Sequence, residues 1–135
     1  MLKFVLGYLA TGLAFALVDS IWLTQVGPRL YRPALDPILA DQFRLGPAVA
    51  FYLIYVLSVT LLVVMPAARD GGWIKAATNG AILGAVAYAT FDLTNQAVLK
   101  VWSTRISVLD IGWGVVLTAS AAVAGCLAVR WLSRI

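Results

Sequence analysis

Three aspartates are the residues of this sequence whose position could support chemistry. Asp19 and Asp92 lie within long apolar runs and Asp110 lies near the start of another, whereas the remaining charged residues lie between such runs or at their ends. An ionisable side chain inside a bilayer costs about 2.5–3.5 kcal/mol on insertion scales, so each carboxyl requires a partner or a function. Carboxyls in such positions can bind a proton or a cation and couple that event to the binding of a second ligand.

The aspartates share helix faces with aromatic and amide side chains. Residues three or four apart are neighbours on a helix, so Trp22 lies beside Asp19 and Trp113 lies beside Asp110. The candidate proton- and ligand-binding site therefore combines carboxyls, an amide, phenols and indoles: Asp19, Trp22, Tyr52, Tyr55, Tyr88, Asp92, Asn95, Asp110 and Trp113.

Burial and mutual repulsion both oppose ionisation when several carboxyls share a low-dielectric site. We therefore predict that at least one of the three aspartates is protonated near neutral pH unless a cation is bound. The sequence has no histidine, all six of its acidic residues are aspartates, and its single cysteine, Cys126, lies in an apolar run. This composition excludes histidine-ligated haem, cysteine-cluster metal sites and an intrachain disulfide, and we predict neither a metal nor another cofactor.

The elements that must position these residues are membrane spans. The chain of 135 residues is 62% apolar and only 12% charged, with a mean hydropathy of +0.93, whereas soluble domains carry roughly 25% charged residues. A span needs about 20 apolar residues, and four apolar runs meet this need. We predict a single transmembrane domain, residues 1–135, with spans at about 4–26, 47–68, 76–99 and 108–130. Short connections predict an all-α, antiparallel, up-down-up-down four-helix bundle.

The alternating directions of these spans bring the three aspartates to one side of the bilayer. Asp19 and Asp92 lie towards the ends of the first and third runs, and Asp110 lies just after the start of the fourth. At a rise of about 1.5 Å per residue, all three carboxyls fall within roughly 4–10 Å of one interface. We therefore predict one polar cluster rather than three separate features.

The connections between the spans provide further predictions about topology. Residues 27–46 contain three prolines, and they also carry Leu35, Ile38, Leu39 and Phe43 at helical spacing. This spacing predicts a short amphipathic helix in the interface plane; an irregular loop is the alternative. The ten basic residues divide equally between the two sides, so the positive-inside rule favours neither orientation strongly. Because those on the side of the termini lie close to span ends, we expect both termini to be cytoplasmic.

Each candidate residue also has a purely structural explanation. Ser107 and Asp110 have the spacing of a capping box, in which the serine caps the fourth helix. Asp19 and Asp92 cannot be caps, because they lie in the C-terminal parts of their helices, where the helix dipole disfavours negative charge. Asp19 and Asp92 could instead form polar contacts between helices. The tryptophans could be anchors at the membrane interface. The candidate partners for such contacts between helices are Asn95, a tyrosine hydroxyl, Lys100 and Arg105.

Several stretches resemble the signature of a bacterial family of small four-span membrane proteins of unknown function. The most specific are Tyr88–Asn95 and Asp110–Gly114, and Asp19–Trp22 and Phe51–Tyr55 are similar to other recurring segments of that family. The resemblance covers essentially the whole chain and implies four spans, a shared polar site and a bacterial inner-membrane location. Phe91 stands where the family pattern has a second tyrosine, which leaves that position without a phenol.

The function that these observations favour is binding or translocation of a proton or cation together with a small or lipid-like ligand. A four-span chain is small for a carrier, so we expect a homodimer or a larger membrane complex; the pair Gly80 and Gly84 fits either a dimer contact or packing within one bundle. The alternatives are an accessory subunit of a membrane complex and a component of a lipid-modifying enzyme. The sequence contains no nucleophile, metal triad or nucleotide-binding loop, so enzymatic activity stays an open question. Membrane lipid is an expected partner, and the scattered basic residues do not indicate nucleic acid.

Overall fold

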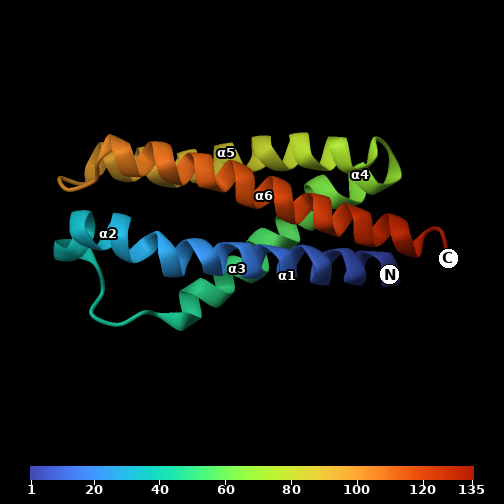
Figure 1. Cartoon of the computed structure of the whole chain (residues 1–135), viewed down its shortest axis with the longest axis horizontal. Coiled ribbons are helices and arrows are strands. Elements are labelled where there is room, and N and C mark those ends of the chain that lie inside the picture. The colour runs from blue at the N-terminus through green and yellow to red at the C-terminus, as the bar shows by residue number, and fades with distance from the viewer.

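The computed structural model describes residues 1–135 and consists of helices joined by short connections, with no β-strand. Its elements are α1 (Leu2–Gln25), α2 (Gly27–Leu35), the 3₁₀ turn η1 (Asp36–Ile38), α3 (Leu45–Val59), the π-helical turn η2 (Thr60–Val64), α4 (Met65–Arg69), α5 (Gly72–Val98) and α6 (Thr104–Leu132). Because α3, η2 and α4 are continuous, the chain forms four long helical segments. Successive segments run in opposite directions, and both termini lie at one end of the molecule (Figure 1). The predicted all-α class is confirmed.

Three segments are long and apolar enough to cross a membrane: Leu2–Gln25, Leu45–Arg69 and Thr104–Leu132. They correspond to the first, second and fourth predicted spans, and their ends differ from the predicted ends by about one helical turn or less. The third predicted span corresponds to α5, which has the length of a span at 27 residues. It is not one of the three, because Asn79, Asp92 and Asn95 make it more polar.

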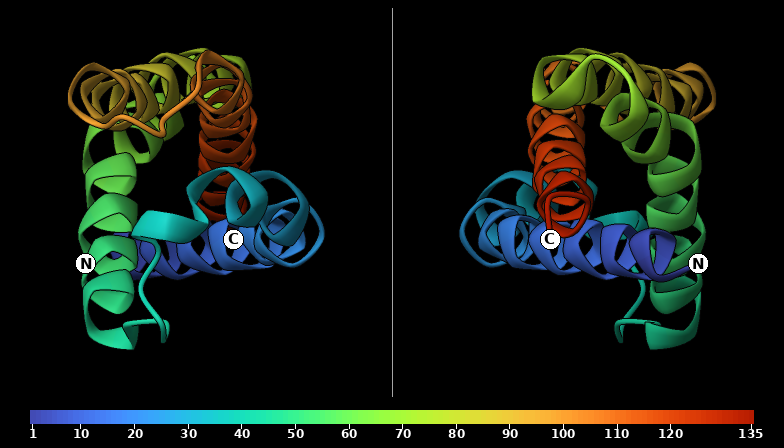
Figure 2. Two further views of the ribbon diagram at one scale, coloured as in Figure 1. Left: turned by 90° about the vertical axis from the view of Figure 1, so that its left-hand side faces the viewer. Right: turned by 90° about the vertical axis from the view of Figure 1, so that its right-hand side faces the viewer.

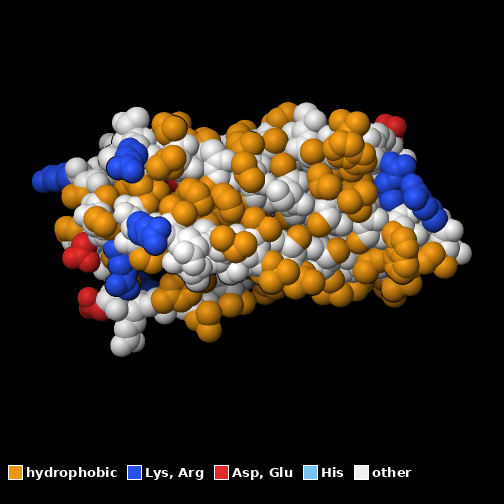
Figure 3. Space-filling view, viewed as in Figure 1, with side chains coloured by type: hydrophobic (Ala, Val, Ile, Leu, Met, Phe, Trp, Pro, Cys, Tyr) orange, Lys and Arg blue, Asp and Glu red, His pale blue; other side chains and the backbone are white.

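The outer surface of the molecule is apolar along most of its length. Figure 3 shows hydrophobic side chains over the middle of the visible face, with lysine, arginine and aspartate gathered at the two ends. Leucines on the outer face of α1, such as Leu9, Leu13 and Leu17, are exposed. Such a surface is unfavourable in water and favourable against hydrocarbon, as expected for a membrane protein.

The closest helix packing joins α5 to α6, which lie side by side along their lengths (Figure 2). A Cβ atom at Gly84 would lie 2.1 Å from the carbonyl oxygen of Gly114, and one at Gly80 would lie 3.0 Å from the Cα of Ala119. At Gly84 only glycine permits this approach of the two backbones, and at Gly80 a side chain would require the neighbouring helix to shift slightly. The small residues Gly80 and Gly84 therefore serve packing within the bundle, one of the two roles considered for them.

The apolar core lies where α1, η2 and α6 meet, and includes Phe15, Val64 and Leu117. The π-helical turn ends two residues before Pro66, which has no N–H to donate to the preceding turn of a helix. Thr60, also in this region, is buried and donates from Oγ1 to the carbonyl oxygen of Val56 at 2.7 Å. In this part of the core, the buried hydroxyls of Thr11 and Thr60 bond to carbonyl oxygens of their own helices.

The connection between α1 and α3 contains a helix at a position different from the predicted one. The predicted helical stretch extended from Leu35 to Phe43, whereas α2 ends at Leu35 and is followed only by the short turn η1. Pro28 stands in the first turn of α2, where a missing N–H and a fixed φ favour helix initiation. Leu39 has extended backbone angles, so the helical spacing of the later apolar residues does not correspond to a helix.

The start of α6 corrects the predicted capping box. The helix begins at Thr104 and is capped by Ser103, whose hydroxyl accepts from the backbone N–H of Ile106 at 3.3 Å. Ser103 occupies the capping position one turn earlier than Ser107, which leaves Ser107 inside the helix and buried. Asp110 is therefore not part of a cap and is available for other contacts.

Candidate functional site

Asp19 joins three helices through its carboxylate. It lies on α1 and is 8% exposed, and its Oδ2 accepts a hydrogen bond from the hydroxyl of Tyr52 on α3. Its Oδ1 accepts from the indole N–H of Trp113 on α6 at 3.1 Å. Both carboxylate oxygens therefore have a donor from another helix, which is what the interhelical role considered for this residue requires.

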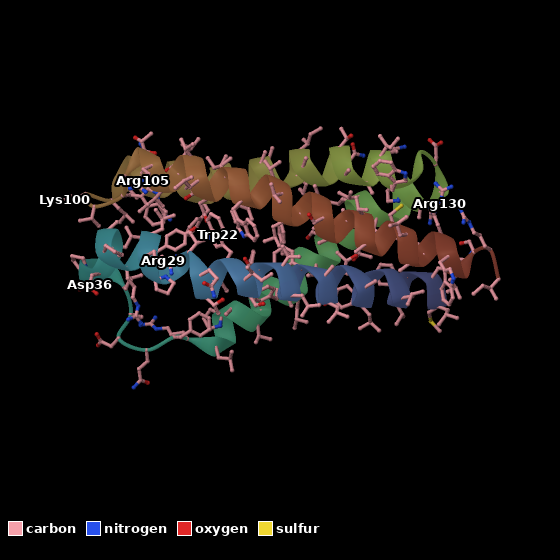
Figure 4. The ribbon with its side chains drawn as sticks, viewed as in Figure 1. Trp22, Arg29, Asp36, Lys100, Arg105 and Arg130 are labelled. Carbon is pink, nitrogen blue, oxygen red and sulfur yellow. The ribbon has the colours of Figure 1, made fainter.

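A stacked pair of indoles connects Asp19 to Asp110. The rings of Trp22 and Trp113 are nearly parallel, with centroids 4.6 Å apart. The indole N–H of Trp22 donates to the hydroxyl of Tyr31 at 3.0 Å, and this hydroxyl in turn donates to Oδ1 of Asp110. Figure 4 shows Trp22 between α1 and the helices above it. The two aspartates thus belong to one continuous polar and aromatic network.

Tyr31 comes from α2, which folds back over the end of the bundle and packs through Leu30 and Leu35 against Ile106. Burial raises the pKa of the Tyr31 phenol above its ordinary value, and the hydrogen bond to Asp110 raises it further. The phenol therefore keeps its proton and acts as a donor to Asp110 at any physiological pH.

Asp92 has no comparable donor. It lies on α5 with 0% of its surface exposed, and neither carboxyl oxygen has a hydrogen-bond partner. The neighbouring titratable group is the carboxyl of Asp110. Two carboxylates can only accept, so neither can satisfy the other unless a proton lies between them. A buried acceptor left unpaired costs about 1–3 kcal/mol, and more if it is charged.

No basic side chain compensates this acidic cluster. The ion pair that the structure contains joins Lys75 to Asp70 at 3.3 Å, at the opposite end of the molecule. Lys100 lies in the α5–α6 connection and Arg105 in the first turn of α6, both at this end of the molecule (Figure 4), and neither forms an ion pair with an aspartate. The considered pairing of Asp19 or Asp92 with either of these residues is therefore wrong, because both cations remain at the surface, where they are hydrated.

A lateral cavity of about 330 Å³ leads to Asp110 from the outer surface. Its lining residues come from α3, α5 and α6: Phe51, Tyr55, Ala87, Tyr88, Phe91 and Asp110. Phe51 and Phe91 are about half exposed and form its rim, so the cavity opens between α3 and α5 towards the surroundings of the bundle. Inside, the hydroxyl of Tyr55 bonds to that of Thr118 at 2.8 Å. The cavity is an apolar, aromatic space with a carboxyl on its inner wall.

The structure brings together most of the residues predicted for the site, and leaves one apart. Asn95 is half-buried and its side chain makes no hydrogen bond, whereas its neighbour Gln96 accepts from Ser107 at 2.7 Å and donates to Thr104 at 2.8 Å. Gln96 was not predicted, because a step of three residues from Asp92 leads to Asn95. The helix instead directs Gln96, four residues from Asp92, towards α6. Tyr31 was missed because nothing in a connecting segment signals that it folds back onto the bundle.

The chemistry open to this arrangement is proton exchange and the binding of a small molecule. No group of three or more histidine, cysteine, aspartate or glutamate side chains is placed to hold a metal ion. Two carboxyls in contact can share a proton and release it when a positive charge approaches.

Comparison with known proteins gives a family but no activity. The family model described as "Predicted membrane protein (DUF2177)" matches residues 4–127. This match covers most of the chain and confirms the resemblance to membrane proteins of unknown function. No curated protein and no solved structure matches the chain.

Proposed function

The chain belongs to the family of predicted membrane proteins DUF2177, and we propose that it binds one exchangeable proton between Asp92 and Asp110 together with a small amphiphilic ligand in the lateral cavity. The observation that carries this proposal is the complete burial of Asp92 with no donor on either oxygen. A carboxyl that serves only to join helices is expected to have donors, as Asp19 does. Asp92 has none, so its burial is favourable only when a proton occupies the pair.

We propose that all four long helical segments cross the bilayer. α5 is the most polar of them, but its polarity faces inward, where Asp92 is buried against α6. Its outward-facing residues Ile82, Val86 and Leu93 are apolar and exposed. An apolar outer face with an inward polar residue is typical of a span within a bundle. α2 would then lie at the membrane surface, above the carboxyl pair.

We place both termini in the cytoplasm and the chain in a bacterial inner membrane. Cys126 is buried, so cysteines introduced by Asp41→Cys and Ser133→Cys can be labelled selectively in intact cells with an impermeant maleimide. We expect labelling at position 41 and none at position 133 until the cells are opened. Labelling of both positions from outside would rule out four spans, and labelling of position 133 alone would reverse the orientation.

The lateral cavity suggests the ligand class. Its walls are aromatic and its rim faces the surroundings of the bundle, which suits an apolar body that enters from the lipid. Asp110 suits a cationic or hydroxyl head group. When an ammonium group binds there, the positive charge stabilises both carboxylates, and the shared proton leaves for the solvent. Binding of the ligand and binding of the proton are thus competitive.

Infrared spectroscopy of the purified protein in lipid nanodiscs tests whether a carboxyl of the pair is protonated. We expect a band from a protonated carboxyl near neutral pH, and expect Asp92→Asn to abolish it. Asp19→Asn is the matched control and should retain the band, because Asp19 is already satisfied by two donors. Three ionised aspartates near neutral pH, in the absence of any added cation, would overturn the proposal.

The ligand is tested with two probes of equal chain length, dodecylamine and dodecanol. We expect dodecylamine to release a proton from the wild-type protein, measured with a pH-sensitive dye, and to release none from Asp110→Asn in the same nanodiscs. Dodecanol should bind without proton release. Equal release from the wild type and Asp110→Asn would show that the amine acts on the lipid alone and would overturn the ligand class.

A second candidate function is that of an accessory subunit in a membrane complex. The half-exposed aromatic rim formed by Phe51 and Phe91 favours it, because a helix of a partner subunit or of a second copy could fill the same lateral opening. This function predicts that the protein co-purifies stoichiometrically with a partner. It also predicts that substitution of Asp92 leaves the activity of the complex unchanged. Recovery of a homogeneous small assembly that still binds dodecylamine would contradict it.

A further inference from the structure

A second cavity, of about 540 Å³, lies at the opposite end of the molecule, beside the turn between α4 and α5. Its lining combines two arginines and two tryptophans with glycines and aliphatic residues: Gly71, Gly72, Trp73, Ile74, Leu127, Arg130, Trp131 and Arg134. None of these residues belongs to the carboxyl site, so the proposed proton binding does not explain this cavity.

The turn is shaped to receive the guanidinium group of Arg130. Gly71 and Gly72 both have positive φ, 93° and 66°, a conformation that side-chain-bearing residues rarely adopt. A Cβ atom at Gly72 would lie 2.1 Å from a terminal nitrogen of Arg130. Figure 4 shows Arg130 extending from α6 towards this turn. The glycines thus leave the space in which the guanidinium lies.

The positive charge of this cavity is not neutralised by the protein. Asp70 is the neighbouring carboxylate, but it pairs with Lys75, and neither Arg130 nor Arg134 forms an ion pair. The cavity therefore attracts an anion, and guanidinium groups match the geometry of a phosphate.

The remaining lining residues point to a lipid rather than to a free anion. Trp73 is 55% exposed and Trp131 is 63% exposed, and Ile74 and Leu127 are exposed beside them. Indole rings favour the boundary between head groups and hydrocarbon, while aliphatic side chains favour acyl chains. Free phosphate would gain nothing from these apolar groups.

We propose that this cavity binds the head group of an anionic phospholipid, with Arg130 and Arg134 on the phosphate and the two indoles beside the glycerol and the first acyl carbons. Basic pockets between helices at a membrane surface are suited to such head groups. The site is independent of the carboxyl pair and of any proton that the pair binds.

The test uses tryptophan quenching by phospholipids brominated on their acyl chains. We expect brominated phosphatidylglycerol to quench more strongly than brominated phosphatidylcholine at equal mole fraction in nanodiscs. Arg130→Gln and Arg134→Gln should each weaken this preference about fivefold. A basic residue at the membrane surface contributes about 1 kcal/mol to the binding of an anionic lipid, which corresponds to this change in affinity. Lys100→Gln, at the other end of the molecule, is the matched control and should leave the preference unchanged.

Three results would overturn the proposal: equal quenching by the two lipids, an unchanged preference in Arg134→Gln, or loss of the preference when inorganic phosphate is added in excess. The last result would identify free phosphate as the ligand. Arg134 is exposed and follows the end of α6, so Arg134→Gln should not disturb folding. This variant therefore tests the proposal even if Arg130→Gln alters the turn.

Discussion

The polar groups at the two ends of this molecule have opposite environments: carboxyls are buried at one end, and charged groups stay at the surface at the other. At the end covered by α2, three carboxyls are buried with no ion pair, and one of them has no hydrogen-bond donor. Towards the other end, the charged residues stay at the surface, and a buried hydroxyl such as that of Thr11 bonds to its own helix, at Gly7, over 2.7 Å. Buried polar groups away from α2 are therefore satisfied within the protein. The end covered by α2 instead retains a carboxyl pair that stability alone would not favour.

The largest expected effect concerns the packing that both ends share. Gly84→Ala should lower the free energy of unfolding by about 3 kcal/mol, because its methyl group would collide with the backbone of Gly114. Gly112→Ala is the matched control: no atom lies within 4 Å of its added Cβ, so it should be neutral or slightly stabilising. Denaturation in mixed micelles measures both, and equal stabilities would contradict the close α5–α6 approach.

A smaller loss is expected from the satisfied carboxyl. Asp19→Ala should destabilise the protein by about 2 kcal/mol, because it leaves the hydroxyl of Tyr52 and the indole of Trp113 without their acceptor. The same denaturation measurement applies, and adding Tyr52→Phe should cost less in the Asp19→Ala background than in the wild type. Additive effects of the two substitutions would show that this bond does not hold α1 to α3.

The unsatisfied carboxyl should respond with the opposite sign. At a pH high enough to remove the shared proton, Asp92→Asn should stabilise the protein by about 1 kcal/mol, because the amide still donates to Asp110 where the carboxylate cannot. The same variant loses the protonated-carboxyl band, so stability rises as function is lost. If Asp92→Asn instead destabilises the protein as much as Asp19→Ala does, the distinction between the two aspartates fails.

The smallest effect separates helix stability from proton binding. Ser103→Ala removes the cap of α6 and should cost about 0.5 kcal/mol. Because Ser103 does not contact the carboxyl pair, the infrared band should remain. Disappearance of the band would mean that proton binding depends on general stability at this end rather than on the pair itself.

The same cap illustrates where sequence reasoning stops. Ser103 and Ser107 stand four residues apart, near the start of the same apolar run. Local pattern favoured Ser107 because a carboxyl follows it at capping-box spacing, yet tertiary packing extends the helix by one more turn and buries Ser107 against Gln96. The helical segments themselves were predictable, because long apolar runs and short connections allow few other arrangements.

The sequence by itself determined that the chain is a helical membrane protein, and it predicted that Asp19, Asp92 and Asp110 lie near one end of the bundle. Hydropathy and the rise per residue suffice for those conclusions. Only the tertiary structure decided that Asp19 has two donors and Asp92 none, and that Tyr31 folds back onto Asp110. Those outcomes depend on the rotation of each helix about its axis and on the path of a connection, which are set by packing between residues distant in sequence.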